Sequence, residues 1–185
     1  MPMCDRFTAR PRTGPILVLV LSVFLVACAA PGVAPRQDDT SLVFGHITVP
    51  QRLTHVYLYE VGHAYIGTLN MPRATVYRNG DFAIANLRPG DYYLAGFTDR
   101  SRTYWVNYSK SSLKRGLIHV GQDQVLFAGA FQVTDVDSKR FGNGSFDIRR
   151  VTRPTGDEIL RRLRVRAEDS GWRSLIDSRL KKGKP

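Results

Sequence analysis

Apolar and polar residues alternate along most of the chain between residues 42 and 151, with the period of two that is typical of half-buried β-strands. The run LVFGHITV at 42–49 ends at Pro50, and the run HVYLYEV at 55–61 ends at Gly62. Similar runs lie at 74–77, 82–85, 92–97, 103–108, 117–120, 125–133 and 145–151. About nine short strands with Gly, Pro and Asn between them predict a mainly β domain over residues 41–151, an antiparallel sandwich or barrel.

Two connections carry residues of specific turns. Asn79-Gly80 separates two alternating runs and predicts a type I′ hairpin, because both central residues of that turn need a positive φ. Leu87-Arg88-Pro89-Gly90 predicts a type II turn in which Pro89 fixes φ and Gly90 is left-handed. We therefore expect two successive hairpins over residues 74–97.

The period changes after residue 154. Thr155 and Glu158 have the spacing of a capping box, in which each side chain satisfies a free amide at a helix start. Apolar residues then recur at helical spacing, at Ile159, Leu160, Leu163, Ala167, Trp172, Leu175, Ile176 and Leu180, with Ser170-Gly171 as an interruption. This predicts one kinked amphipathic helix or two short ones over residues 155–182. Short helices are marginal alone in water, so the apolar stripe must dock on the β domain, a partner or a membrane surface.

The first 27 residues have the pattern of an exported chain. Arg6, Arg10 and Arg12 precede an apolar run at 16–27 that is broken only by Ser22 and is shorter than the roughly 20 residues of a spanning helix. This predicts a signal peptide over residues 1–27. Cys4 lies in this predicted signal, so the mature chain keeps only Cys28 and has no disulfide.

Leu25-Val26-Ala27-Cys28 resembles the lipobox of bacterial lipoproteins. The resemblance implies that Cys28 receives a diacylglycerol thioether, becomes the mature N-terminus and is acylated on its amine. Two or three acyl chains anchor a protein stably in a bilayer. In that family an aspartate after the cysteine marks inner-membrane retention, so Ala29 implies the outer membrane. The alternative is a signal peptide cut elsewhere, with Cys28 as a small buried residue.

The segment 28–40 has few large apolar side chains and holds two prolines, a glycine and three charges. It predicts a flexible tether that reaches about 40 Å when extended. The formal net charge of the chain is +11, and residues 149–185 carry +7 of it, with twelve basic and five acidic side chains. Export argues against nucleic acid as the partner of this basic tail. The tail is then either a solvated helix face or a binding surface for anionic lipid or glycan.

The stretch 79–94, NGDFAIANLRPGDYYL, resembles the core motif of carboxypeptidase regulatory-like and other transthyretin-like (prealbumin-like) domains. The motif consists of a glycine, alternating apolar residues, a Pro-Gly turn and an aromatic strand. The resemblance covers residues 42–97 and implies an antiparallel β-sandwich that serves as an accessory module, with no catalytic residues. The opening glycine and proline motif of these families is absent, because residues 50–56 read PQRLTHV.

No catalytic or cofactor motif emerges from the rest of the chain. His46, His55, His63 and His119 lie on or beside predicted strands without zinc-ligand spacing, although His55 and His63 could converge on a metal. Gly144-Ser145 fits a glycine-rich turn, and Asp81, Asp91, Asp135 and Asp137 fit turn aspartates that bond their own backbone.

Aromatic residues are concentrated in the middle of the chain, at Tyr57, Tyr59, Tyr65, Tyr77, Tyr92, Tyr93, Tyr104, Trp105 and Tyr108. Alternation places Tyr57 and Tyr59 on one face, and Tyr92 and Tyr93 on opposite faces. A row of exposed tyrosines near Arg100, Arg102 and Lys110 predicts a surface for a protein partner, a peptide or a glycan, unless the rings are ordinary half-buried strand residues.

The sequence therefore predicts a lipid-anchored bacterial envelope protein that acts as a non-catalytic binding or assembly module. Its partners are the bilayer, through acylated Cys28, and an envelope protein. Two alternatives remain, a binder of anionic lipid or glycan through the basic tail, and an envelope hydrolase or metal-binding protein.

Overall fold

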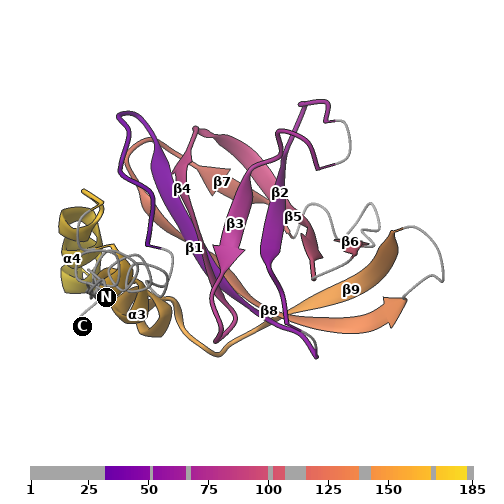
Figure 1. The fold of residues 1–185 in the computed structure, drawn as a ribbon. Coiled ribbons are helices and arrows are strands. Elements are labelled where there is room, and N and C mark those ends of the chain that lie inside the picture. The colour runs from indigo at the N-terminus through magenta and orange to yellow at the C-terminus, as the bar shows by residue number, and fades with distance from the viewer. Residues whose placement is uncertain are drawn as a thin grey trace, which may run out of the picture. The chain divides into compact units, whose positions relative to one another are not determined.

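The computed structural model describes residues 32–50, 52–65, 68–99, 102–106, 116–137, 143–167 and 170–182. Within these ranges it contains nine strands and two helices (Figure 1). The strands are β1 (Ser41–Thr48), β2 (His55–Glu60), β3 (Arg73–Val76), β4 (Asp81–Leu87), β5 (Gly90–Thr98), β6 (Thr103–Val106), β7 (Ile118–Val120), β8 (Val125–Asp137) and β9 (Gly144–Val151). The helices are α3 (Gly156–Arg166) and α4 (Arg173–Lys182). The prediction of a mainly β fold followed by helices is confirmed.

Eight of these strands form one closed barrel, in the order β2-β3-β4-β1-β8-β9-β6-β5, and β5 pairs back with β2. The short strand β7 pairs with β5 as an additional strand. The pairings β1–β8 and β6–β9 are parallel, and the others are antiparallel. The expected antiparallel sandwich is thus corrected to a mixed barrel. Alternation fixes which face of a strand is buried but not its partners, so it could not predict two parallel pairs between distant segments.

The barrel interior holds one apolar core, to which each of its eight strands contributes. The contributing side chains include Val43, Val56, Ala74, Phe82, Leu94, Tyr104, Phe131 and Phe146. Gly45 is needed where β1 passes between β4 and β8. A Cβ there would lie 2.6 Å from Cζ of Phe82 and 2.7 Å from the carbonyl oxygen of Gly129. The missing side chain makes room for the Phe82 ring inside the barrel.

The hairpin predicted at Asn79-Gly80 is confirmed, because β3 and β4 pair antiparallel across this turn. The turn type differs from the prediction. The Gly80 N–H donates to the Tyr77 carbonyl over 2.9 Å, the Tyr77 N–H donates to the Asp81 carbonyl over 2.8 Å, and Gly80 alone in the turn has a positive φ, of 84°. This is the pattern of a three-residue loop with a left-handed glycine at its end, rather than type I′.

The second predicted hairpin, at Pro89-Gly90, is wrong. β4 pairs with β3 and β1, whereas β5 pairs with β2, β6 and β7, so β4 and β5 belong to different parts of the barrel wall. Gly90 has no positive φ, and Asn86 takes the left-handed conformation instead, with φ 61°. Although β4 and β5 do not pair, Phe82, Ile84, Tyr92 and Leu94 all enter the same core.

The two helices cover the outer face of β1 and β8, at one side of the barrel (Figure 1). Their apolar stripe packs on outward residues of these strands in a second core, which includes Leu42, Phe44, Ile159, Leu160, Leu163, Trp172 and Ile176. The predicted capping box is present, with the Thr155 N–H donating to Glu158 Oε2 over 2.7 Å and the Glu158 N–H donating to Thr155 Oγ1 over 3.4 Å. Neither helix, nor any other helical segment within the described ranges, has the length and apolar character needed to cross a bilayer.

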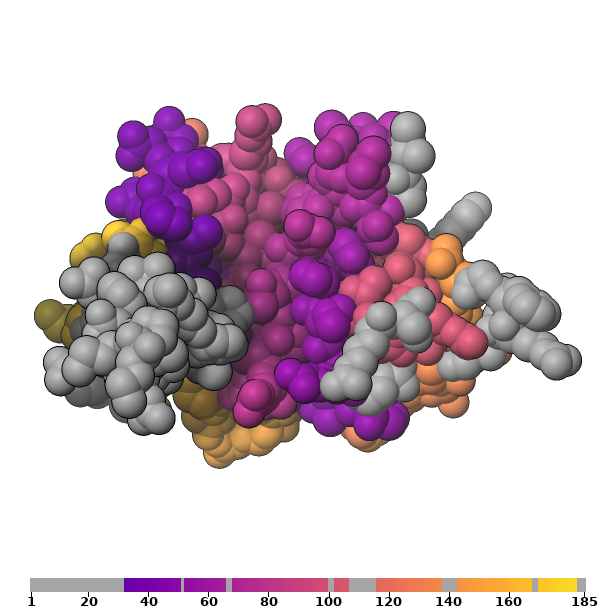
Figure 2. All heavy atoms as spheres, in the orientation of Figure 1, coloured from indigo at the N-terminus to yellow at the C-terminus, as the bar shows by residue number. Residues whose placement is uncertain are grey.

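The described part of the predicted tether, residues 32–40, lies against the folded domain. The Arg36 N–H donates to the Ser170 carbonyl over 2.7 Å, and Trp172 Nε1 donates to the Ala34 carbonyl over 3.1 Å. Asn86 holds the same segment from β4, because its amide bonds the Pro35 carbonyl at 2.8 Å and the Gln37 N–H at 2.9 Å. Figure 2 shows this indigo segment on the surface beside the yellow helix α4.

Candidate functional site

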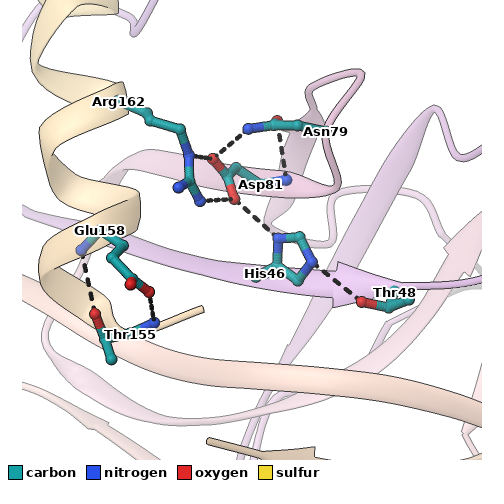
Figure 3. A network of polar contacts seen from close by, with 7 residues as sticks. All are labelled: His46, Thr48, Asn79, Asp81, Thr155, Glu158 and Arg162. Carbon is teal, nitrogen blue, oxygen red and sulfur yellow. Dashed lines mark hydrogen bonds and ion pairs between the residues drawn. The ribbon is translucent and has the colours of Figure 1, made fainter. Parts of the chain in front are cut away.

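A buried carboxylate connects β1, the β3–β4 turn and α3 (Figure 3). Asp81, at the start of β4, is 1% exposed. Its Oδ1 lies 2.9 Å from Nδ1 of His46, its register partner on β1. Its Oδ2 accepts from Asn79 Nδ2 at 2.7 Å. Arg162 of α3 binds both oxygens, through Nε at 2.7 Å and Nη2 at 2.9 Å.

The electrostatics of this network favour the ionised carboxylate. Burial acts to raise the pKa of Asp81, but hydrogen bonds from His46, Arg162 and Asn79 outweigh it and lower the pKa below its ordinary value. The same ion pair raises the pKa of Arg162. The Asp81 charge is therefore compensated by a bidentate guanidinium, and the pair fixes α3 to the barrel.

The network continues from His46 to a hydroxyl group. His46 Nε2 lies 3.1 Å from Oγ1 of Thr48, two residues along the same face of β1 (Figure 3). The order carboxylate, imidazole, hydroxyl is the order used in triad hydrolases, where the imidazole takes a proton from the nucleophile. Here both carboxylate oxygens also bind Arg162, so the same hydrogen bonds are explained by the attachment of the helix.

An open cavity of about 1190 Å³ lies beside this network, at the end of the barrel where β1 ends and β2 begins. His46, Arg52, His55 and Arg78 contribute to its lining, and none of the described residues that line it is acidic. Burial, followed by the charge of Arg73, lowers the pKa of His55. Val49, Leu53 and Val76 add apolar surface, so the cavity suits an anion with an apolar part.

A group of aromatic side chains covers the outer face of β2, β5 and β6, and we call it the aromatic surface: Tyr57, Tyr59, Tyr65, Tyr93 and Trp105. The rings of Tyr59 and Tyr93, which are register partners, stack at 5.0 Å, and Tyr65 meets Tyr59 edge-on at 5.3 Å. Tyr57 and Trp105 both pair with Gly96, and their ring centroids lie 6.4 Å apart.

The aromatic surface is only partly buried. Tyr59, Tyr65, Tyr93 and Trp105 are half-buried, whereas Tyr57 is covered. Burial is the first cause that raises the pKa of Tyr65 and of Tyr93, so both hydroxyls are neutral at physiological pH. The predicted alternation is confirmed, because Tyr92 points into the core and bonds the Arg88 carbonyl while Tyr93 lies outside. Arg100, Tyr108 and Lys110, expected nearby, lie outside the described residues.

The structure does not bring the four histidines together. His46 bonds Asp81, His119 bonds Asp91 at 2.6 Å, and His63 lies against Tyr65. His55 begins β2 while His63 follows its end, so the convergence proposed for a zinc site does not form. Among the residues that the structure describes, no three metal-binding side chains come together. Cys28 and the predicted signal peptide lie outside the described residues.

Several basic residues of the helices have local partners that the sequence did not indicate. Arg164 binds Asp177 across α3 and α4, Arg153 binds Glu158, and the Arg166 guanidinium lies 4.2 Å from the centre of the Tyr77 ring. The Arg166–Tyr77 contact and the Arg162–Asp81 pair attach the tail to the barrel, whereas the Arg164–Asp177 pair joins the two helices to each other. The Arg162–Asp81 and Arg166–Tyr77 partners lie more than eighty residues apart in sequence, so helical or strand spacing could not predict them.

No family model matches the chain, and the comparisons with curated proteins and with solved structures find none that is similar to it.

Proposed function

We propose that this chain is a lipid-anchored protein of the bacterial envelope that acts as a non-catalytic assembly module. The observation that carries the proposal is the aromatic surface on the outer face of β2, β5 and β6. Tyrosine, tryptophan and methionine are enriched where proteins bind one another, and charged residues are depleted at the centre of such interfaces. The partner we propose is therefore another envelope protein.

The membrane part of the proposal depends on the sequence. A charged start, a short apolar run and Leu25-Val26-Ala27-Cys28 together support a lipoprotein signal and acylation of Cys28. Ala29 supports the outer membrane as the destination, on its periplasmic face or at the cell surface.

The hydrolase alternative has one specific observation in its favour, the order Asp81, His46, Thr48 beside an open cavity. We give it second place because Arg162 occupies both oxygens of the same carboxylate, which supports a structural role for the network.

Replacing Cys28 with serine is expected to abolish incorporation of labelled palmitate and to move the protein from the membrane fraction to the soluble fraction. A serine hydroxyl cannot form the thioether that carries the diacylglycerol. Mass spectrometry of the wild-type product should show the mature chain beginning at acylated Cys28. Equal labelling of the two proteins would contradict the lipid anchor, and a Cys4→Ser variant should behave as the wild type.

A photo-crosslinking side chain at Tyr93 is expected to capture an envelope protein in intact cells. The same group at Asp147, an exposed position on β9, is the matched control. Adding Tyr59→Ala and Tyr65→Ala to the Tyr93 probe removes two neighbouring rings, and we expect the crosslinked product to fall at least about tenfold, since aromatic anchors contribute about 2 kcal/mol each. Equal products from positions 93 and 147 would contradict the proposed interface.

A further inference from the structure

The chain enters the folded domain at the C-terminal end of α3. The Val33 N–H donates to the Arg166 carbonyl over 3.2 Å, and a Cβ at Gly32 would lie 3.4 Å from the same oxygen. Three residues, 29–31, separate Gly32 from Cys28. Fully extended, the four steps from Cys28 to Gly32 span only about 14 Å. A lipid on Cys28 therefore holds the domain near the bilayer, and not at the end of a tether of about 40 Å.

The helices at this entry point have an exposed, basic side. Val165, next to Arg166, is 73% exposed, and Arg161 lies one helical turn before it on the same side of α3 and is also exposed. The helix α4 adds three exposed cations, Arg179, Lys181 and Lys182. Two acidic side chains of these helices are occupied in ion pairs, Glu158 with Arg153 and Asp177 with Arg164.

We propose that this outer side of α3 and α4, defined by Arg161, Val165, Arg179, Lys181 and Lys182, rests on the anionic phospholipid headgroups of the membrane that holds the protein. The inference depends on the proposed lipid anchor and adds an orientation to it. Each lysine or arginine near an anionic leaflet strengthens association about fivefold, within a Debye length of about 10 Å. The short connection to Cys28 keeps the C-terminal end of α3 within about 14 Å of the point where the lipid would enter the membrane surface. Val165 then lies at the headgroup boundary, and the aromatic surface remains available to a protein partner.

An environment-sensitive fluorophore can report this orientation. Cys28 is acylated in the proposed mature chain, so a Val165→Cys substitution supplies its only free thiol. The matched control is Leu69→Cys, because Leu69 is also apolar and 65% exposed but lies between β2 and β3. The full lipidated chain is placed in vesicles of phosphatidylcholine with phosphatidylglycerol, and in vesicles of phosphatidylcholine alone. Quenching by aqueous iodide measures the exposure of each probe.

In the anionic vesicles we expect iodide quenching at position 165 to be several-fold weaker than at position 69. Arg161→Glu and Arg179→Glu together should restore quenching at position 165, and vesicles of phosphatidylcholine alone should do the same. Equal quenching of the two probes in a chain that stays acylated and vesicle-bound overturns the orientation and leaves the lipid anchor intact. Protection that is equal in both kinds of vesicle overturns the anionic partner. Loss of acylation, measured separately by mass, overturns the anchor itself.

Discussion

Unfolding of a Trp172→Ala variant is expected to require about 4 kcal/mol less free energy than unfolding of the wild-type chain. The Trp172 side chain is fully buried between the helices and the outer face of the barrel. Its removal leaves a large cavity and also breaks the hydrogen bond from Nε1 to the Ala34 carbonyl. The loss is measured by urea denaturation followed by circular dichroism.

The second tryptophan of the chain provides the matched control. Trp105 is half-buried on the aromatic surface, and we expect Trp105→Ala to cost about 1 kcal/mol or less. The Trp172 variant should also become sensitive to proteolysis within residues 32–40, because that segment loses one of its attachments. Equal losses for the two tryptophan variants would contradict the buried position of Trp172.

The Asp81→Ala variant is expected to lose about 3 kcal/mol of stability, because removal of one partner leaves His46 and Arg162 without their carboxylate. Arg162 is partly exposed and can turn to water, which keeps the loss at the lower end of the range for buried pairs. The control is Asp91→Ala, which removes another Asp–His contact at the surface, with His119. We expect that change to cost less than about 1 kcal/mol.

The effect of Asp81 on stability should depend on pH in a definite direction. The folded pKa of Asp81 is lowered, so its contribution is present above the unfolded pKa of about 3.9 and disappears as the pH falls through the folded value. The stability difference between the wild type and Asp81→Ala should therefore stay constant from neutral pH to about 5 and shrink below about pH 4. A difference that grows in acid would contradict the lowered pKa.

Local rules predicted those features of the fold that depend on neighbouring residues. Thr155 and Glu158 could be identified as a capping box because their contact spans three residues. Alternation correctly separated Tyr92, in the core, from Tyr93, outside it. Pairing between distant strands has no such local signal. The parallel alignment of β1 with β8 places Gly45 beside Gly129, and their separation of more than eighty residues leaves no pattern to detect.

In the candidate site, too, the sequence indicated local features but not the contacts between distant residues. Asp81 was predicted to be a turn aspartate that bonds its own backbone. In the structure the Asn79 side chain does this instead, because its Oδ1 accepts from the Asp81 N–H at 3.3 Å, while the Asp81 carboxylate binds side chains. Its contact with Arg162 was missed, because eighty-one residues separate the two and many arginines of the tail have similar surroundings in sequence. The Pro89-Gly90 turn was misjudged because the motif resembles a hairpin, while the strands that it connects pair with other neighbours.

The closed barrel limits how strands of one copy of the protein can pair with strands of another copy. In the described part of the chain, each of the eight barrel strands pairs on both sides, so few backbone donors and acceptors are left for another molecule. Only β7, three residues long with the exposed His119 at its centre, pairs on a single side there. Short edge strands with polar side chains resist intermolecular sheet growth. Copies concentrated in two dimensions by the proposed lipid anchor should accordingly resist edge-to-edge sheet growth into fibrils.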